Sequence, residues 1–182
     1  MKHSASSVLI ALVCASAMGS AQVFSQESTS PAPTDQLASF FVGSGSCTGN
    51  TLGKDMKSSH ATTGKYTAER ALDGHWVVVR YNEDQSAAAP KPFRVVQYFG
   101  YDAAKKRYVA VGVYNAAGTY SIGTSAGWDG DSIAFDEGDA GKPAAFRDTF
   151  TSGHGGFAGH TGMMRDKNGK WIKTDEETCT KT

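Results

Sequence analysis

The sequence predicts an all-β protein, an antiparallel up-and-down β-barrel of about ten strands, and three features lead to this fold class. From Leu37 onward, short runs of alternating or β-branched residues recur about every ten residues, a spacing typical of successive hairpins. Most of these runs end in turn residues, such as Asp73-Gly74 and Asp129-Gly130. No segment has the length and apolar periodicity of a helix longer than about three turns.

Taken in order, the predicted elements are strands joined by short loops, with one longer insert. The first strand leaves room for a short helical turn over Asp35 to Phe41 at its start. The Pro- and Ala-rich stretch from Asp84 to Pro92 is the longest expected loop. The ten predicted strands lie near residues 39–49, 58–72, 75–82, 93–101, 107–114, 119–128, 131–137, 144–152, 157–165 and 170–179.

A tight turn at Asp73-Gly74 fixes the register of one hairpin. It places Arg70 opposite Val77, and directly opposed residues share one face of a sheet. The residues on this face are Tyr66, Ala68, Arg70, Leu72, His75, Val77, Val79 and Tyr81. Because the face is mostly apolar, we expect it to line the interior, with Arg70 and His75 as its polar groups.

The same counting, applied to the turns near 103–106, 115–118 and 129–130, predicts a second apolar face. It places Thr124 opposite Phe135 and Ala126 opposite Ile133. The residues expected to face the interior are Arg94, Val96, Tyr98, Val109, Val111, Val113, Tyr120, Ile122, Ile133 and Phe135. Those expected to face solvent are Ser121, Gly123, Ser125 and Asp136. Beyond Gly138 two alternatives stay open: either Phe146 and Phe150 or Arg147 point inward.

Residues 1–21 have the features of a secretory signal peptide. Lys2 gives a positive start, an apolar stretch follows over Val8 to Val13, and Gly19-Ser20-Ala21 offers small residues for cleavage. Cleavage after Ala17 is the alternative. The apolar stretch is too short to span a bilayer.

Export would leave residues 22–36 as a flexible Ser-, Thr-, Gln- and Pro-rich leader and residues 37–182 as the barrel domain. The predicted location is therefore the periplasm or the exterior of a bacterium. Cys14 is removed with the signal unless it is lipidated, an alternative that the sequence leaves open.

The charge balance argues against nucleic acids and anionic lipids as partners. Removal of residues 1–21 leaves 17 basic and 18 acidic residues, a net charge of −1. The longest basic run, Lys105-Lys106-Arg107, falls on an expected hairpin tip. A protein without a basic patch has no electrostatic attraction for polyanions. The sequence gives no indication of the oligomeric state.

The two remaining cysteines, Cys47 and Cys179, lie in the first and last predicted strands. In an oxidising compartment such a pair is expected to form a disulfide, here one that joins the two ends of a closed sheet. The alternative is that Cys47 is a nucleophile, but no paired base is recognisable.

One group of polar side chains is a candidate ligand site inside the barrel. An arginine inside a small barrel is costly unless it is paired, and a ligand carboxylate or phosphate would pair it bidentately. The alternative is pairing with Asp148 or Glu137, or a place at the rim. The candidate residues are Tyr66, Arg70, His75, Tyr81, Arg94, Tyr98 and Tyr120.

No motif assigns a catalytic residue or a metal site. Gly123 to Gly127 matches the G-x-S-x-G pattern, but Ser125 lies within a predicted strand and no helix follows. His154 and His160 stand in a Gly-rich segment without a recognisable third ligand. A Cys-x-x-Cys-His motif is absent, which excludes covalent haem but leaves non-covalent haem as an alternative.

Several stretches resemble a bacterial family of secreted, uncharacterised, lipocalin-like barrels of the calycin group, which also includes nitrobindins and fatty-acid-binding proteins. The stretches are Phe40 to Gly49, Gly64 to Trp76, Phe99 to Asp102 and Gly118 to Asp131. The resemblance implies a closed antiparallel barrel that opens at one end. The tryptophan that usually plugs a calycin barrel is replaced by Gly45, so Phe41 or Trp171 fills that end, or the cavity is wider. The haem-binding histidine of nitrobindins cannot be assigned to His154 or His160, because no motif around either residue matches.

These observations favour non-catalytic binding of a small amphipathic or apolar ligand inside the barrel. The alternatives are a haem protein like the nitrobindins, a structural envelope protein whose barrel is filled by its own side chains, and an enzyme that uses interior Tyr and Arg residues. The sequence identifies neither the ligand nor the volume available to it.

Overall fold

The computed structural model describes residues 31–53, 55–115, 119–138, 142–153 and 156–182. Pro31–Thr182 form one folded unit. The predicted signal peptide, Cys14, most of the predicted leader, and His154 lie outside the described residues.

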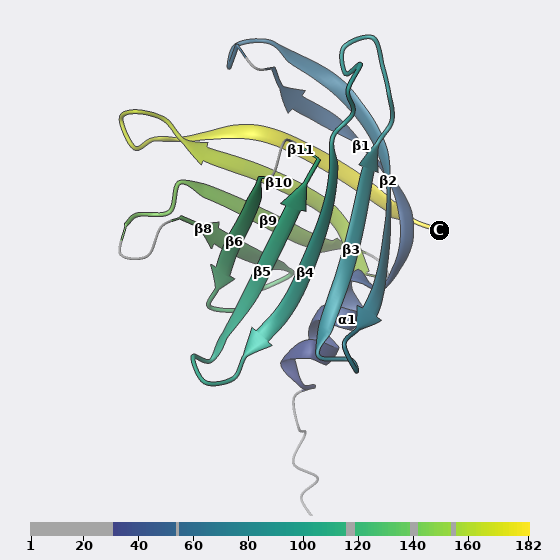
Figure 1. Ribbon diagram of the computed structural model, residues 1–182, viewed down its shortest axis with the longest axis vertical. Coiled ribbons are helices and arrows are strands. Elements are labelled where there is room, and N and C mark those ends of the chain that lie inside the picture. The colour runs from purple at the N-terminus through teal and green to yellow at the C-terminus, as the bar shows by residue number, and fades with distance from the viewer. Residues whose placement is uncertain (1–30, 54, 116–118, 139–141, 154–155) are drawn as a thin grey trace, which may run out of the picture. The chain divides into compact units, whose positions relative to one another are not determined.

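One short helix precedes the strands, and the strands follow one another in hairpins (Figure 1). The elements are α1 (Pro33–Phe41), β1 (Gly43–Leu52), β2 (Ser59–Ala71), β3 (Trp76–Glu83), β4 (Arg94–Asp102), β5 (Arg107–Tyr114), β6 (Tyr120–Ser125), β7 (Trp128–Asp129), β8 (Ser132–Glu137), β9 (Phe146–Gly153), β10 (Gly156–Arg165) and β11 (Trp171–Lys181). Each predicted strand is present, and the predicted helical turn is a full helix. None of the described helices is long and apolar enough to span a bilayer.

The sheet closes on itself and forms a ten-stranded antiparallel barrel, which confirms the predicted fold class. Sequential strands pair as neighbours from β1 to β6 and from β8 to β11, and the pairings of β1 with β11 and of β6 with β8 complete the ten-stranded barrel, whereas the two-residue β7 pairs with β8 alone. Figure 1 shows the strands curving around a common interior, with α1 beside the end where β2 turns into β3. The barrel therefore has an end next to α1, called the plugged end below. The half of the barrel at the opposite end, which no described helix covers, is called the open half.

The register of the first hairpin is as predicted. Tyr66 pairs with Tyr81, and Arg70 pairs with Val77. The β5–β6 hairpin also has the predicted register, with Val111 opposite Ile122.

The predicted pairing across the turn at 129–130 is wrong, by one residue at Thr124 and by two residues at Ile133. Thr124 pairs with Asp136 rather than with Phe135, and Ile133 pairs with Trp128 rather than with Ala126. The physical cause is a break after β6, where Gly127 adopts a φ of +136°. The hydroxyl of Ser125 accepts a hydrogen bond from the backbone N–H of Gly127, which fixes this break.

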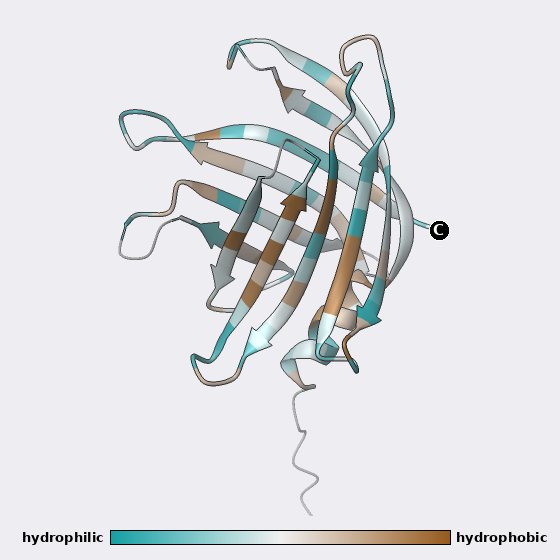
Figure 2. Cartoon of the chain, viewed as in Figure 1, coloured by the Kyte–Doolittle hydropathy of each residue, from teal (hydrophilic) through white to brown (hydrophobic). Residues whose placement is uncertain are grey.

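A larger error concerns which face lies inside. The apolar face of β4, β5 and β6 points outward rather than into the barrel. The expected interior residues Val113, Ile122 and Tyr120 are 50%, 54% and 71% exposed. Strict alternation places their neighbours in β4 and β5 on the same outer face. These neighbours are Arg94, Val96, Tyr98, Val109 and Val111. Figure 2 shows hydrophobic bands along β5.

Small side chains line the inner face at β5 and β6 instead. Ala110, Gly112, Gly123 and Ser125 are buried there, so Ser121, Gly123 and Ser125 face inward, contrary to the prediction. A Cβ on Gly123 would lie 3.1 Å from the Cβ of Phe135. Aromatic rings such as Phe99 and Phe135 occupy the space beside the middle of β5 and beside β6, so small residues stand there, and the inward-facing tyrosines of β5, Tyr108 and Tyr114, lie at its two ends. Ile133 and Phe135 are buried in it, as predicted.

Helix α1 closes the plugged end with its apolar face. Phe41 is 1% exposed, stacks on Phe99 with ring centroids 4.5 Å apart, and meets Phe150 edge-on at 5.4 Å. Full burial of each such ring contributes on the order of 2 kcal/mol. Of the two aromatic residues expected as alternatives for filling an end of the barrel, Phe41 fills the plugged end, whereas Trp171 lies under the guanidinium of Arg165.

The predicted disulfide is confirmed. Cys47 and Cys179 lie directly opposite each other on β1 and β11, with their Cα atoms 4.0 Å apart and their sulfur atoms bonded. The two cysteines are 132 residues apart, so the chain-entropy model assigns the crosslink up to about 4–5 kcal/mol.

Candidate functional site

The predicted site residues near the plugged end do not converge. Tyr66 is buried in the core and its ring lies against Gly45. Arg70 forms an ion pair of 2.7 Å with Asp35 of α1, and both side chains are about half exposed. His75 is exposed on the β2–β3 turn. Arg70 therefore lies at the rim, the alternative that the sequence analysis left open.

Three further predicted site residues lie on the outer face of the barrel. Arg94 and Tyr98 alternate with Phe99, which is fully buried, and Tyr120 is the most exposed large hydrophobic residue described. Arg94 lines a shallow outer hollow together with Arg80. Only Tyr66 and Tyr81 of the seven predicted residues face the interior, so the predicted arginine-based anion site is not assembled there.

A different set of polar side chains faces the interior in the open half of the barrel. Five carboxylates come from four strands, and we call them the interior acidic cluster. They are Glu83 of β3, Glu137 of β8, Asp148 of β9, and Asp175 and Glu177 of β11. Alternation from buried neighbours such as Cys179, Phe150 and Phe135 places them on the inner face.

His160 of β10 links two of these carboxylates. Its Nε2 lies 3.2 Å from an oxygen of Asp148, and its Nδ1 lies 2.9 Å from an oxygen of Asp175. Burial disfavours the imidazolium, but the hydrogen bonds and charges of the two carboxylates outweigh it and raise the pKa of His160 to about 10. His160 is therefore a cation at neutral pH.

Glu177 forms the second polar contact of the cluster, with Tyr81. The hydroxyl of Tyr81 donates a hydrogen bond to Glu177. Two glycines make room for the pair, because a Cβ on Gly64 would lie 2.5 Å from the Tyr81 hydroxyl and a Cβ on Gly49 would lie 2.8 Å from Cγ of Glu177. Burial raises the pKa of Glu177, and burial together with Glu177 raises the pKa of Tyr81.

Glu137 forms the third contact, at the end of a short hydrogen-bond chain. Ser121 donates to Glu137 at 2.8 Å, and its oxygen lies 2.6 Å from the hydroxyl of Tyr114. Burial, reinforced by the charge of Asp148, raises the pKa of Glu137 to about 7. Burial also raises the pKa of Tyr114 to about 12.

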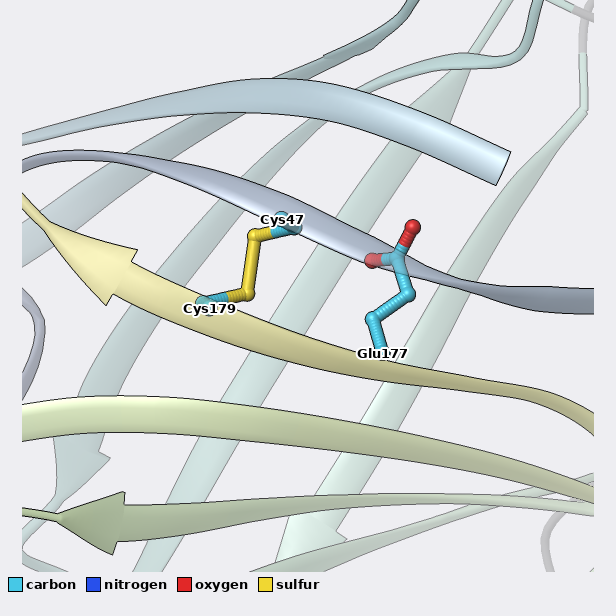
Figure 3. A group of neighbouring side chains, drawn as sticks. All are labelled: Cys47, Glu177 and Cys179. Carbon is cyan, nitrogen blue, oxygen red and sulfur yellow. A yellow bond between two sulfur atoms is a disulfide. The ribbon is translucent and has the colours of Figure 1, made fainter. Parts of the chain in front are cut away.

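Neither the cysteine-containing trio of possible metal ligands nor His160 presents a free ligand atom to a metal ion or a haem iron. In the described part of the chain, one trio of possible metal ligands lies close together: Cys47, Glu177 and Cys179 (Figure 3). Its two sulfurs are bonded to each other, so neither is a thiolate that binds a metal. Both ring nitrogens of His160 face carboxylates, which leaves no free lone pair for iron.

Sequence reasoning named Asp148 and Glu137 as possible partners of an interior arginine but missed the cluster they belong to, although one signal was available. Cysteines are among the most often buried residues, and once Cys179 is placed inside on that ground, a period of two along its strand also places Glu177 and Asp175 inside. No such reference residue was available for His160 and Asp148, because the unknown length of the β8–β9 loop left the register of their strands undetermined. His160 appeared in the sequence analysis only as an unassigned histidine.

Comparison with known proteins supports the fold and assigns no activity or ligand. The model of a family described as "Protein of unknown function (DUF1579)" matches residues 30–181. No curated protein matches the sequence. The solved structure of Rv2717c from M. tuberculosis is similar, with a TM-score of 0.58, 13% identity, and 83% of this chain and 98% of that chain covered.

Proposed function

The chain belongs to the DUF1579 family, and we propose that this member binds a small amphipathic ligand inside its barrel without transforming it. The apolar part of the ligand would rest on the aromatic rings near α1, and its polar part would face the open half.

One observation carries this proposal: the interior is divided into an apolar and a polar half, and water reaches the polar half. The side chains of His160, Asp148 and Asp175 point inward yet keep 19%, 21% and 26% of their surface exposed. The plugged half is built from rings that are almost fully buried, such as Phe99 and Phe41. A site with apolar walls and a few oriented polar groups is typical of small-molecule binding.

The test uses two neighbouring residues of β4 that point in opposite directions. Gln97 faces inward between Val79 and Gly112, whereas Val96 faces outward. Saturable binding of the neutral dye N-phenyl-1-naphthylamine is measured by fluorescence. Gln97→Trp fills the interior and should weaken binding at least tenfold, and Val96→Trp should not. Absence of saturable binding to the parent protein, or equal effects of both variants, would refute the proposal and favour a barrel filled by its own side chains.

We also propose that the protein is exported, because the crosslink between Cys47 and Cys179 needs an oxidising compartment. The predicted signal peptide over residues 1–21 would supply the route. Mass spectrometry of the protein isolated from its native cell should give an N-terminus after Ala21 or Ala17, or a lipid on Cys14. An intact N-terminus on the main species would contradict export by this route.

The haem alternative finds no support in the geometry around His160. The measurement that decides it is an absorption spectrum of the purified protein after addition of haemin. We expect no shifted Soret band with a one-to-one titration end point.

A further inference from the structure

We propose that the interior acidic cluster binds the cationic head of the ligand, an alkylammonium or guanidinium group. This inference rests on the proposed binding function and names the chemical class of the ligand. It reverses the expectation from the sequence, which was an anionic head held by arginines.

The first argument is the balance of charge inside the open half. The cluster holds five carboxylates: His160 is the cation between two of them, and Glu83 lies 4.0 Å from the His60 imidazole and accepts a hydrogen bond from the backbone N–H of Phe93. In the described strands and loops of this half, every lysine and arginine stands on the outer face or on a turn. Arg147, for example, points outward to Asp136, and Arg80 points outward to Glu69. Glu137 and Glu177 accept hydrogen bonds from Ser121 and Tyr81 but form no ion pair with a described basic side chain, and a bound cation would relieve the cost of burying their charge.

The second argument is a hydroxyl without a partner beside the cluster. Thr62 of β2 is 5% exposed, and its Oγ1 is buried without a hydrogen bond. It lies opposite Gly49, which in turn lies opposite Glu177. Two residues along β2, Gly64 makes room for the Tyr81 hydroxyl. The Thr62 hydroxyl therefore lies on the inner face beside the Tyr81–Glu177 pair, where an N–H donor of a ligand would satisfy both Thr62 and Glu177.

The third argument favours an organic cation over a metal ion. A metal ion needs several ligand atoms converging to within about 2.6 Å of one point. In the described chain, no three of these carboxylates and histidines bring ligand atoms within 4.8 Å of one another. An ammonium or guanidinium group suits more widely spaced acceptors, because it has several N–H donors and also interacts favourably with aromatic faces such as those of Tyr81 and Tyr114.

The experiment compares three ligands that share one tail and differ in the head: decylammonium, decanol and decanoate. Each is titrated into the folded, disulfide-bonded protein by calorimetry below its micelle-forming concentration. We expect decylammonium to bind at least tenfold more tightly than decanoate. Millimolar calcium or magnesium chloride should not displace it beyond the effect of sodium chloride at equal ionic strength.

Three variants connect the preference to the cluster. Glu177→Gln keeps a partner for Tyr81 but removes the charge, and it should weaken decylammonium binding at least tenfold. Thr62→Val preserves shape and should weaken it at least threefold. The matched control is Glu69→Gln, which removes a carboxylate that pairs with Arg80 on the outer face and should leave binding unchanged.

The outcomes separate this inference from the proposed function. If decanoate or decanol binds as tightly as decylammonium, the barrel binds ligands but the cationic head is refuted. If calcium displaces decylammonium specifically, the site prefers a metal ion and the inference fails. If none of the three ligands binds, the proposed binding function fails with it. Equal decylammonium affinities of Glu177→Gln, Thr62→Val and Glu69→Gln would also overturn the assignment to this cluster.

Discussion

At the scale of single residues, His160 determines the electrostatics of the interior. Among the described residues it is the interior side chain held between two carboxylates, and its hydrogen bond lowers the pKa of Asp175 although burial acts in the opposite direction. A cation shared by two acids stabilises both, and its removal leaves them facing each other without compensation. We therefore expect the free energy of unfolding to depend on the protonation of the His160 imidazole.

We predict that His160→Gln destabilises the fold by about 3 kcal/mol at pH 7, the range for breaking a buried ion pair. The folded-state pKa of about 10 lies above the ordinary value of 6.5. The contribution of His160 is therefore fully present below pH 6.5 and is lost as the pH rises towards 10. Between pH 7.5 and 9.5 the parent protein should lose stability by about 1 kcal/mol per pH unit, and the variant should not.

Urea unfolding across this pH range measures both quantities. This window lies above the pKa of Glu137, so that carboxyl contributes little to the slope. His75→Gln, on an exposed turn, is the control and should keep the parent profile. Parallel profiles for His160→Gln and the parent protein would show that the imidazolium does not stabilise the fold.

At the scale of elements, the hairpins were predictable and the choice of inner face was not. Turn residues and strict alternation gave the pairing of Arg70 with Val77 and of Val111 with Ile122, because these depend on local geometry. Which face points inward depends on what fills the interior. Phe41 of α1 and the ring of Phe99 occupy the space beside β5, and nothing in the sequence pattern of β5 indicates that these rings lie there.

The two faces of β5 and β6 can be distinguished by substitutions of similar size. Ile122→Thr removes an apolar group from the outer face and should change the free energy of unfolding by less than about 0.5 kcal/mol. Gly123→Val adds a side chain next to Phe135 on the inner face and should cost about 1–3 kcal/mol. Thermal unfolding of both variants is the measurement. A larger loss for Ile122→Thr than for Gly123→Val would mean that the original prediction of the inner face was right.

At the scale of the whole molecule, two seams close the barrel with very different strength. β1 and β11 pair over seven residue positions, from Gly45↔Lys181 to Thr51↔Asp175, and carry the disulfide. β6 and β8 pair at only two positions, because the chain leaves the ladder at Gly127. The first seam was predictable from the cysteines. The second was not, since it depends on a backbone break rather than on a side-chain pattern.

We predict that the barrel opens first at the β6–β8 seam. Regions with few hydrogen bonds open with lower free energy than the global unfolding reaction, and native-state hydrogen exchange detects such openings. Peptides covering residues 120–125 and 132–137 should exchange faster than those covering 43–52 and 171–181. A Cys47→Ser/Cys179→Ser double variant should lower the global free energy of unfolding by up to about 4–5 kcal/mol, yet keep this order of exchange. If residues 43–52 became the first to exchange in the double variant, the disulfide rather than the pairing ladder would be what keeps that seam closed.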